Sequence, residues 1–386
     1  MRRSLAILSI ALGCGTSAPT SDAPDAAGET SVDDSAGTVD TGTSTVDSAT
    51  GDSTSDSSPD APPTDRKLLI KHGQDVPYPT WVGSHVAMMD AMPFDGFVVT
   101  TMLSANVQSQ TPLSRASFDA ALAPMKGAAF KNLKTNFVIV RTTPAGSWFS
   151  DQTTPANNFG VVAASARDAG LHGVVFDNEA YTNPVFSAGR CEGKPLAECR
   201  DRVRAVGKQT MAAMIASWPE VVVLVFLGPY ISEPKTATFF SGSFPYNDVS
   251  AANPTITSFI LGMVEATVGT AARVVDGGEI YTQRTDAQFE RSYLWQKTEL
   301  AKQSNLFPPA LVPEYAKAIS VSFGVYDRPY IGAPMTLAIF EPTIVNALKR
   351  ADRYVWVYTE LYDWWGSGFP ATKVPPEWVE AVRRTR

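Results

Sequence analysis

The segment Gly173-Val174-Val175-Phe176-Asp177-Asn178-Glu179 joins a continuous apolar run to an abrupt acidic end. Such a run is typical of a parallel strand that is buried on both faces. Successive side chains of a strand point to opposite faces, so Val175, Asp177 and Glu179 share one face. We therefore predict a strand with one apolar face against helices and two carboxylates at the C-terminal end of the other face.

Similar apolar runs alternate with amphipathic segments along residues 66–386. The expected strands are Lys67–His72, Gly96–Met102, Asn136–Thr142, Gly173–Glu179, Val221–Gly228, Arg273–Tyr281, Val321–Asp327 and Tyr354–Glu360. The expected helices are Thr80–Met92, Arg115–Ala129, Ala156–Ala169, Ala197–Ser217, Thr255–Val268, Ala287–Gln303, Met335–Arg350 and Glu377–Arg384. Eight strand-then-helix units predict an α/β fold of the (β/α)8 TIM barrel type. The alternative is a doubly wound open sheet, but His72-Gly73-Gln74-Asp75 is not the Gly-rich phosphate turn of that fold.

The first residues have the features of an export signal. Residues 2–12 consist of a basic start followed by a short apolar run. The apolar run is too short to span a bilayer as a helix. Ala11-Leu12-Gly13-Cys14 resembles the bacterial lipoprotein box, which implies a signal peptide over residues 1–14 and acylation of Cys14. The alternative is an ordinary secretory signal. We expect an exported lipoprotein that is membrane-anchored at the cell surface or in the periplasm, or alternatively a secreted protein.

Residues 15–65 differ in composition from the rest of the chain. They are rich in Ser, Thr, Asp, Ala, Gly and Pro, contain no aromatic residue and carry a charge of −11. Such a segment cannot bury enough apolar surface to fold, so we predict a disordered linker. The whole chain carries −7 and its first 65 residues −9, so residues 66–386 carry +2. A near-neutral domain argues against nucleic acid as a partner.

The cysteines and histidines bear on redox state and metals. Cys191 and Cys199, eight residues apart, are expected to form a disulfide in an exported protein. The pair lacks a CxxC spacing and a nearby histidine, so zinc is not indicated. The domain has only His72, His85 and His172, which argues against a His-rich metal centre. We expect no metal and no cofactor.

The last expected strand repeats the pattern of the fourth. In Tyr354–Glu360, alternation places Trp356, Tyr358 and Glu360 on the barrel face. Aromatic residues follow, including Trp364 and Trp365. Aromatic rings beside carboxylates suit sugars, because rings stack on the C–H faces while polar groups bind the hydroxyls.

An Asp-x-Glu pair that ends a fourth strand, followed by an aromatic residue, resembles the barrel glycoside hydrolases related to the chitinases. The resemblance implies that Glu179 is the proton donor and that Asp177 orients it or the substrate. The family has a further Asp where this chain has Val175. Asn178-Glu179 is also similar to the Asn-Glu of the large retaining-glycosidase clan, whose nucleophile lies on strand seven, where this chain has Tyr326-Asp327. The Glu360 ending with its two tryptophans resembles bacterial glycoside-hydrolase-like barrels.

Glycoside hydrolysis needs two carboxyl groups, one protonated and one ionised. We expect Glu179 to be the general acid, assisted by Asp177, with Glu360 as the preferred second carboxylate and Glu279 as its rival. A separation of about 5–5.5 Å implies retention of configuration and about 6.5–9.5 Å inversion. The candidate substrate-binding residues are His72, Arg141, Asn178, Tyr181, Tyr281, Tyr326, Asp327, Tyr358, Trp364 and Trp365.

These observations lead to a first hypothesis, a cell-surface glycoside hydrolase that acts on an extracellular polysaccharide or glycan. The alternative is a non-catalytic carbohydrate-binding lipoprotein on a degenerate glycosidase barrel, because a fold does not fix a function. A lyase that uses the same acids is a third possibility. The expected partners are a glycan and, through the lipid anchor only, a membrane. We expect a monomer.

Overall fold

The computed structural model describes residues 66–104, 107–141, 146–179, 184–240, 247–328 and 335–386. Within these residues, parallel strands form one nine-stranded sheet in the order β7-β6-β5-β4-β3-β2-β1-β9-β8. The strands are β1 (Leu68–Gly73), β2 (Gly96–Val99), β3 (Phe137–Arg141), β4 (Gly173–Asp177), β5 (Val222–Val225), β6 (Arg273–Asp276), β7 (Ile319–Val321), β8 (Phe323–Tyr326) and β9 (Tyr354–Thr359).

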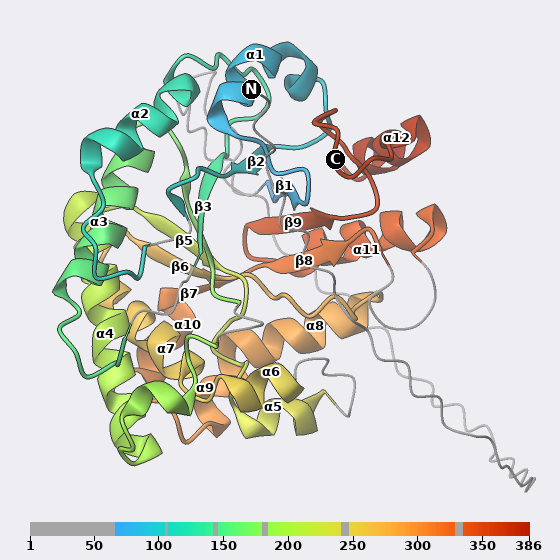
Figure 1. The fold of residues 1–386 in the computed structure, drawn as a ribbon. Helices are drawn as coiled ribbons and strands as arrows, with labels where there is room; N and C mark the ends of the chain where they lie inside the picture. The colour runs from blue at the N-terminus through green and yellow to red at the C-terminus, as the bar shows by residue number, and fades with distance from the viewer. Residues whose placement is uncertain (1–65, 105–106, 142–145, 180–183, 241–246, 329–334) are drawn as a thin grey trace, which may run out of the picture. The chain divides into compact units, whose positions relative to one another are not determined.

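A single residue joins the two edges of this sheet. β7 pairs with β6, β8 pairs with β9, and only Ser322 separates β7 from β8. The N–H of Ser322 donates to the carbonyl of Asp276 at 2.8 Å, and the N–H of Asp352 donates to the carbonyl of Val321 at 2.9 Å. The sheet therefore closes into a barrel in which β7 and β8 together occupy the seventh strand position. The predicted (β/α)8-type barrel is confirmed (Figure 1).

Helices connect the strands and cover the outside of the barrel (Figure 1). They are α1 (Pro79–Asp90), α2 (Arg115–Lys126), α3 (Thr153–Asp168), α4 (Leu196–Ser217), α5 (Pro234–Phe239), α6 (Asn247–Ala252), α7 (Ile256–Thr267), α8 (Asp286–Leu294), α9 (Leu300–Gln303), α10 (Val312–Ala318), α11 (Leu337–Arg350) and α12 (Pro376–Arg384). The helix expected over residues 287–303 is interrupted by a π-helical turn, Trp295–Glu299. The sequence analysis missed α5, α6 and α10, which lie in the connections after β5 and β6.

The side chains of the strands separate into two apolar clusters. Val174 and Phe176 of β4 belong to the outer cluster, which lies between the sheet and the helices. Val175 of β4 and Trp356 of β9 belong to the inner cluster, which fills the barrel. The predicted alternation along β4 and β9 is therefore confirmed, and it directs Asp177 to the barrel side of the sheet.

Cys191 and Cys199 form the predicted disulfide, with their Cα atoms 5.5 Å apart. It links a short 3₁₀ turn (Ala188–Cys191) to the start of α4, within the connection that follows Glu179. The predicted signal peptide, acylated Cys14 and linker lie outside the described residues. Within the described ranges, no helix combines the length and apolar character needed to cross a bilayer.

Candidate active site

The C-terminal ends of β2, β3 and β4 hold Asp177 in a polar contact. The Nε atom of Arg141 donates to Oδ2 of Asp177 at 3.1 Å, and its guanidinium also donates to Oγ1 of Thr100 at 3.4 Å. This contact follows from the strand register, because Arg141 and Asp177 are direct partners on β3 and β4. Burial raises the pKa of Asp177, and the cation of Arg141 opposes that rise.

Glu179 follows β4 directly. Its backbone N–H donates to Oδ1 of Asp177 at 3.3 Å, so the Asp177 carboxylate helps fix the chain where Glu179 leaves the strand. The side chain of Glu179 is half-buried. The structure therefore places Asp177 and Glu179 together at the mouth, as the sequence predicted.

Glu279 reaches the same basin from β6, but through a turn rather than along the strand. β6 ends at Asp276, and Gly278 has a left-handed backbone (φ 60°) in which a Cβ would lie 2.2 Å from the carbonyl oxygen of Ser322. Only glycine fits there. The turn places the Glu279 N–H 3.4 Å from the carbonyl oxygen of Phe226.

The carboxyl group of Glu279 is buried, with 4 % of the residue exposed. Its Oε1 accepts a hydrogen bond from the hydroxyl of Tyr281 at 2.9 Å, whereas Oε2 has no partner among the described residues. Burial raises the pKa of Glu279 well above its ordinary value, and the negative charges of Glu179 and Asp177 raise it further. These effects favour the protonated form of the Glu279 carboxyl.

The electrostatics of Tyr358 indicate that these acids lie near one another. Burial raises the pKa of Tyr358, and so does the negative charge that four nearby carboxyl groups carry when ionised: Glu360, Glu179, Glu279 and Asp177. Its hydroxyl accepts a hydrogen bond from Nε2 of Gln74 at 2.9 Å. The ends of β4, β6 and β9 thus bring their carboxylates around a single phenol.

Both carboxylate oxygens of Glu360 accept hydrogen bonds. The hydroxyl of Tyr326 donates to its Oε2, and Arg328 donates to its Oε1 at 2.7 Å. The negative charge of Glu179 contributes to the raised pKa of Glu279. The engagement of Glu360 and the effect of Glu179 on Glu279 therefore favour Glu279, the rival in the sequence analysis, over Glu360 as the partner of Glu179.

Aromatic rings line the floor of this basin. His72 is buried, and its ring centroid lies 5.1 Å from that of Phe226 and 5.4 Å from that of Tyr358. Burial lowers the pKa of His72 well below its ordinary value, so the imidazole is neutral. The ring of Tyr326 contacts those of Tyr281 and Tyr358 in tilted arrangements, with centroid distances of 5.1 and 5.3 Å.

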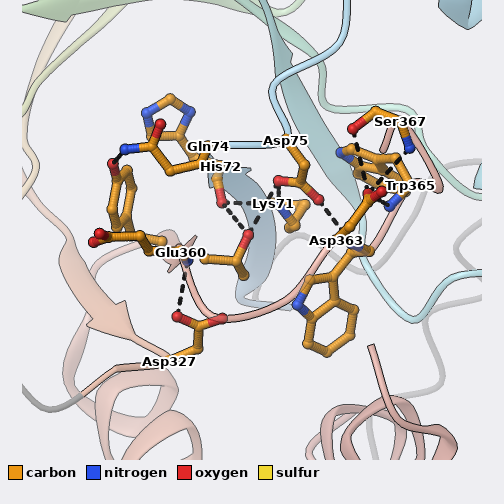
Figure 2. Close-up of polar contacts among 12 residues, drawn as sticks. Lys71, His72, Gln74, Asp75, Asp327, Glu360, Asp363, Trp365 and Ser367 are labelled. Carbon is orange, nitrogen blue, oxygen red and sulfur yellow. Dashed lines mark hydrogen bonds and ion pairs between the residues drawn. The ribbon is translucent and has the colours of Figure 1, made fainter. Parts of the chain in front are cut away.

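A buried ion pair supports the mouth where β1 meets β9. The Nζ of Lys71 donates to Oδ1 of Asp75, and both side chains are fully buried (Figure 2). Oδ2 of Asp75 accepts the backbone N–H of Trp364 at 2.8 Å. Asp363 in turn accepts a series of backbone N–H groups from the turn that follows it (Figure 2). These contacts hold the segment after Glu360 against β1.

Several predicted substrate-binding residues are structural instead. Trp364 and Trp365 are each 1 % exposed and pack in the outer cluster, with ring centroids 5.3 and 6.2 Å from that of Phe94. The turn at Asp363 directs both rings away from the barrel mouth, so they offer no face to a sugar. We therefore exclude both tryptophans from the site.

Asn178 and Asp327 hold the backbone. The side-chain amide of Asn178 donates to the carbonyl of Leu227 at 2.7 Å and accepts from its N–H at 2.9 Å, which ties the end of β4 to that of β5. Asp327 is buried and accepts the N–H of Glu360 at 2.9 Å. Burial raises the pKa of Asp327 to about 6. Tyr181 lies outside the described residues.

The structure adds mouth residues that the sequence analysis did not select: Gln74, Thr100, Phe226 and Arg328. Each of them lies at or just after the end of a strand, which is the signal that could have identified them. Among the described residues, no group of three or more His, Cys, Asp or Glu side chains could hold a metal ion.

No protein-family model and no curated protein matches the chain. Its structure is similar to a GH5-4 broad-specificity endoglucanase from an uncultured bacterium, with 9 % identity, coverage of 78 % of this chain and 83 % of that chain, and a TM-score of 0.44. It is also similar to the 3-keto-D-glucoside 4-epimerase from E. coli, with 13 % identity, coverage of 83 % of this chain and 99 % of that chain, and a TM-score of 0.42. A third similar structure is the hyperthermophilic endocellulase from Pyrococcus horikoshii, with 11 % identity, coverage of 83 % of this chain and 91 % of that chain, and a TM-score of 0.42. With TM-scores below 0.5, these likenesses carry no weight for function, which rests on the side chains of the mouth.

Proposed function

We propose that this protein hydrolyses glycosidic bonds, with Glu279 as the proton donor and Glu179 as the ionised partner. The supporting observation is the buried carboxyl of Glu279, whose pKa is raised by burial and then by the negative charge of Glu179, so that its protonated form is favoured. The two acids come from β4 and from the turn after β6, so a substrate bond bound between them would meet one group from each side. These roles reverse the sequence-based expectation, in which Glu179 was the acid.

The remaining polar groups have supporting roles in this mechanism. Asp177, held by Arg141, adds negative charge beside Glu179 and so helps to retain the proton on Glu279. The neutral His72 can accept or donate a hydrogen bond through Nδ1, which has no partner among the described side chains. Tyr358 and Tyr326 supply ring faces for the apolar side of a sugar. Glu279 transfers its proton to the leaving oxygen, and Glu179 either attacks the sugar carbon or activates water.

We propose an extracellular or cell-surface polysaccharide as the substrate. The support is the predicted export signal and the lipoprotein-like Cys14, which would tether a monomer to a membrane through its lipid only. Labelling of the expressed protein with a radioactive fatty acid, lost in Cys14→Ser, tests the anchor. Unlabelled wild-type protein would contradict it.

A second candidate function is carbohydrate binding without hydrolysis. The observation that favours it is the small exposure of Glu279, whose Oε2 is enclosed, together with the engagement of both Glu360 oxygens. A proton donor must reach the leaving oxygen of the substrate. Carbohydrate binding needs only contacts with the exposed side chains at the barrel mouth.

The test is the release of reducing ends from a panel of polysaccharides by the full chain. We expect Glu279→Gln and Glu179→Gln to lose about 10²–10⁴-fold in turnover, whereas the matched surface variant Glu198→Gln keeps wild-type turnover. Among the described residues, Glu198 pairs only with Lys194, at 3.4 Å, and its side chain is half-exposed. Saturable binding of a glycan with no released product would favour the second function. Wild-type turnover in Glu279→Gln would contradict the mechanism.

A further inference from the structure

A pocket of about 430 Å³ lies at the end of the barrel opposite the mouth. It is lined by residues at or near the starts of the strands, because the strands are parallel and their N-terminal ends meet there. Its floor consists of Tyr354, His172 and the aliphatic side chains of Val222, Val275 and Ile319. The pocket shares no residue with the candidate active site.

The charged residues that line this pocket are mostly cationic: Arg273, Lys297, Lys317, Arg353 and the single carboxylate Asp352. The carboxylate of Asp352 is already engaged. It accepts hydrogen bonds from Nζ of Lys297 at 2.7 Å and from the hydroxyl of Tyr293 at 2.9 Å. It also accepts the N–H of Val321 at 2.9 Å. Lys317 in turn pairs with Glu314 at 3.5 Å, so two positive charges remain in excess.

The two arginines carry this excess. Arg273 donates to the backbone carbonyls of Thr270 at 3.0 Å and Ala272 at 2.8 Å, and Arg353 lies over the ring of Tyr354 at 5.9 Å. Among the residues that the structure describes, neither guanidinium forms an ion pair with a carboxylate. Gathering like charges around a concave surface is unfavourable unless an anion offsets them.

The positive charge around the pocket also affects His172, which lies in its floor. Nε2 of His172 lies 2.7 Å from the hydroxyl of Tyr354. Burial, and then the charge of Arg353, lowers the pKa of His172 to about 4. His172 is therefore neutral in this structure, and a bound anion would move its pKa upward.

We propose that this pocket binds the phosphate group of a phosphate monoester. A dianion matches the charge excess better than a single carboxylate, and the planar guanidinium of arginine suits bidentate contacts with phosphate oxygens. The apolar floor leaves room for the organic part of the ligand. The same phosphate chemistry is offered by a soluble phosphate ester and by a lipid headgroup, and this site is independent of the proposed hydrolysis.

The test is calorimetric titration of the full chain with inorganic phosphate at fixed ionic strength. We expect one saturable site per chain, with a Kd at least about tenfold weaker in Arg273→Gln/Arg353→Gln. The control Lys126→Gln/Lys208→Gln removes the same charge from exposed helix positions and should bind as the wild type does. A single variant, Lys317→Gln, repeats the test at an exposed position if the double variant fails to fold, and it should also weaken binding.

Two further measurements locate the site and its ligand. Saturation with phosphate should raise the pKa of His172 in NMR spectra of the wild-type chain. Sedimentation with phosphatidic acid vesicles that inorganic phosphate reverses would identify a lipid headgroup, and binding to soluble phosphate alone would identify a soluble ester. No saturable phosphate binding, or equal binding by the pocket variants and the control, would overturn the proposal.

Discussion

The hydroxyl of Tyr281 donates to Oε1 of Glu279 at 2.9 Å although the backbone of Tyr281 is left-handed, with φ at 58°. A bulky residue adopts this conformation at a cost of order 1–3 kcal/mol, so the surrounding structure must hold it there. The constraint places a phenol next to a buried acid two residues away. The two side chains thus form one unit at the mouth.

Replacement of Tyr281 by Phe should raise the pKa of Glu279 further. The hydrogen bond stabilises the ionised carboxylate, so its loss favours the protonated form by about 1 kcal/mol, or somewhat less than one pKa unit. If Glu279 acts as an acid, the alkaline limb of kcat against pH moves to higher pH. The exposed Tyr78→Phe is the control. An unchanged profile in Tyr281→Phe would argue against this contact or this role.

Burial of Asp276 predicts a pH-dependent stability. The residue is fully buried at the end of β6, and burial raises its pKa from 3.8 to about 8. Between these values the folded state keeps a proton that the unfolded state has released. Stability should therefore fall as pH rises from about 4 to 8, by up to about 6 kcal/mol at about 1.4 kcal/mol per unit.

Asp276→Asn should remove this fall, because an amide cannot ionise. Denaturant unfolding at pH 5 and pH 9 measures it: the variant should be more stable than the wild type at pH 9. The exposed Asp201→Asn should follow the wild type. If the wild type and Asp276→Asn had the same free energy of unfolding at pH 9, Asp276 would not be a buried acid with a raised pKa.

The fold was largely predictable because its signal is local. Buried parallel strands need continuous apolar runs, and the alternation along β4 and β9 assigned Val175, Asp177, Trp356 and Tyr358 to their observed faces. The break at Ser322 was not predictable, because the two halves of the seventh strand differ in pairing partner and not in composition.

The site was harder to predict because it depends on turns and partners. The sequence placed Glu279 within a strand that reached Tyr281, whereas the strand ends at Asp276 and left-handed residues turn the carboxyl into the mouth. Trp364 was predicted to stack on a sugar, but its backbone N–H is bound by Asp75, which is distant in sequence. Neither the partner nor the turn leaves a periodic pattern in the chain.

The buried pair of Lys71 and Asp75 should contribute strongly to stability. Lys71→Met leaves the Asp75 carboxylate buried without its cation, which costs about 3–5 kcal/mol for such pairs. Lys71→Met/Asp75→Asn should recover part of this loss, because the introduced amide is neutral and its oxygen can still accept the N–H of Trp364. Denaturant unfolding of the three proteins measures it. A loss below about 1 kcal/mol in Lys71→Met would contradict the assignment.

The interaction between Glu179 and Glu279 can be measured directly by ¹³C NMR titration of the Glu279 carboxyl in the wild type and in Glu179→Gln. We predict a pKa for Glu279 well above 4.5 in the wild type and a lower one in Glu179→Gln, because the negative charge of Glu179 is removed. Glu198→Gln should leave the titration unchanged. An ordinary pKa for Glu279, or one that ignores the loss of Glu179, would contradict the pairing of these two acids.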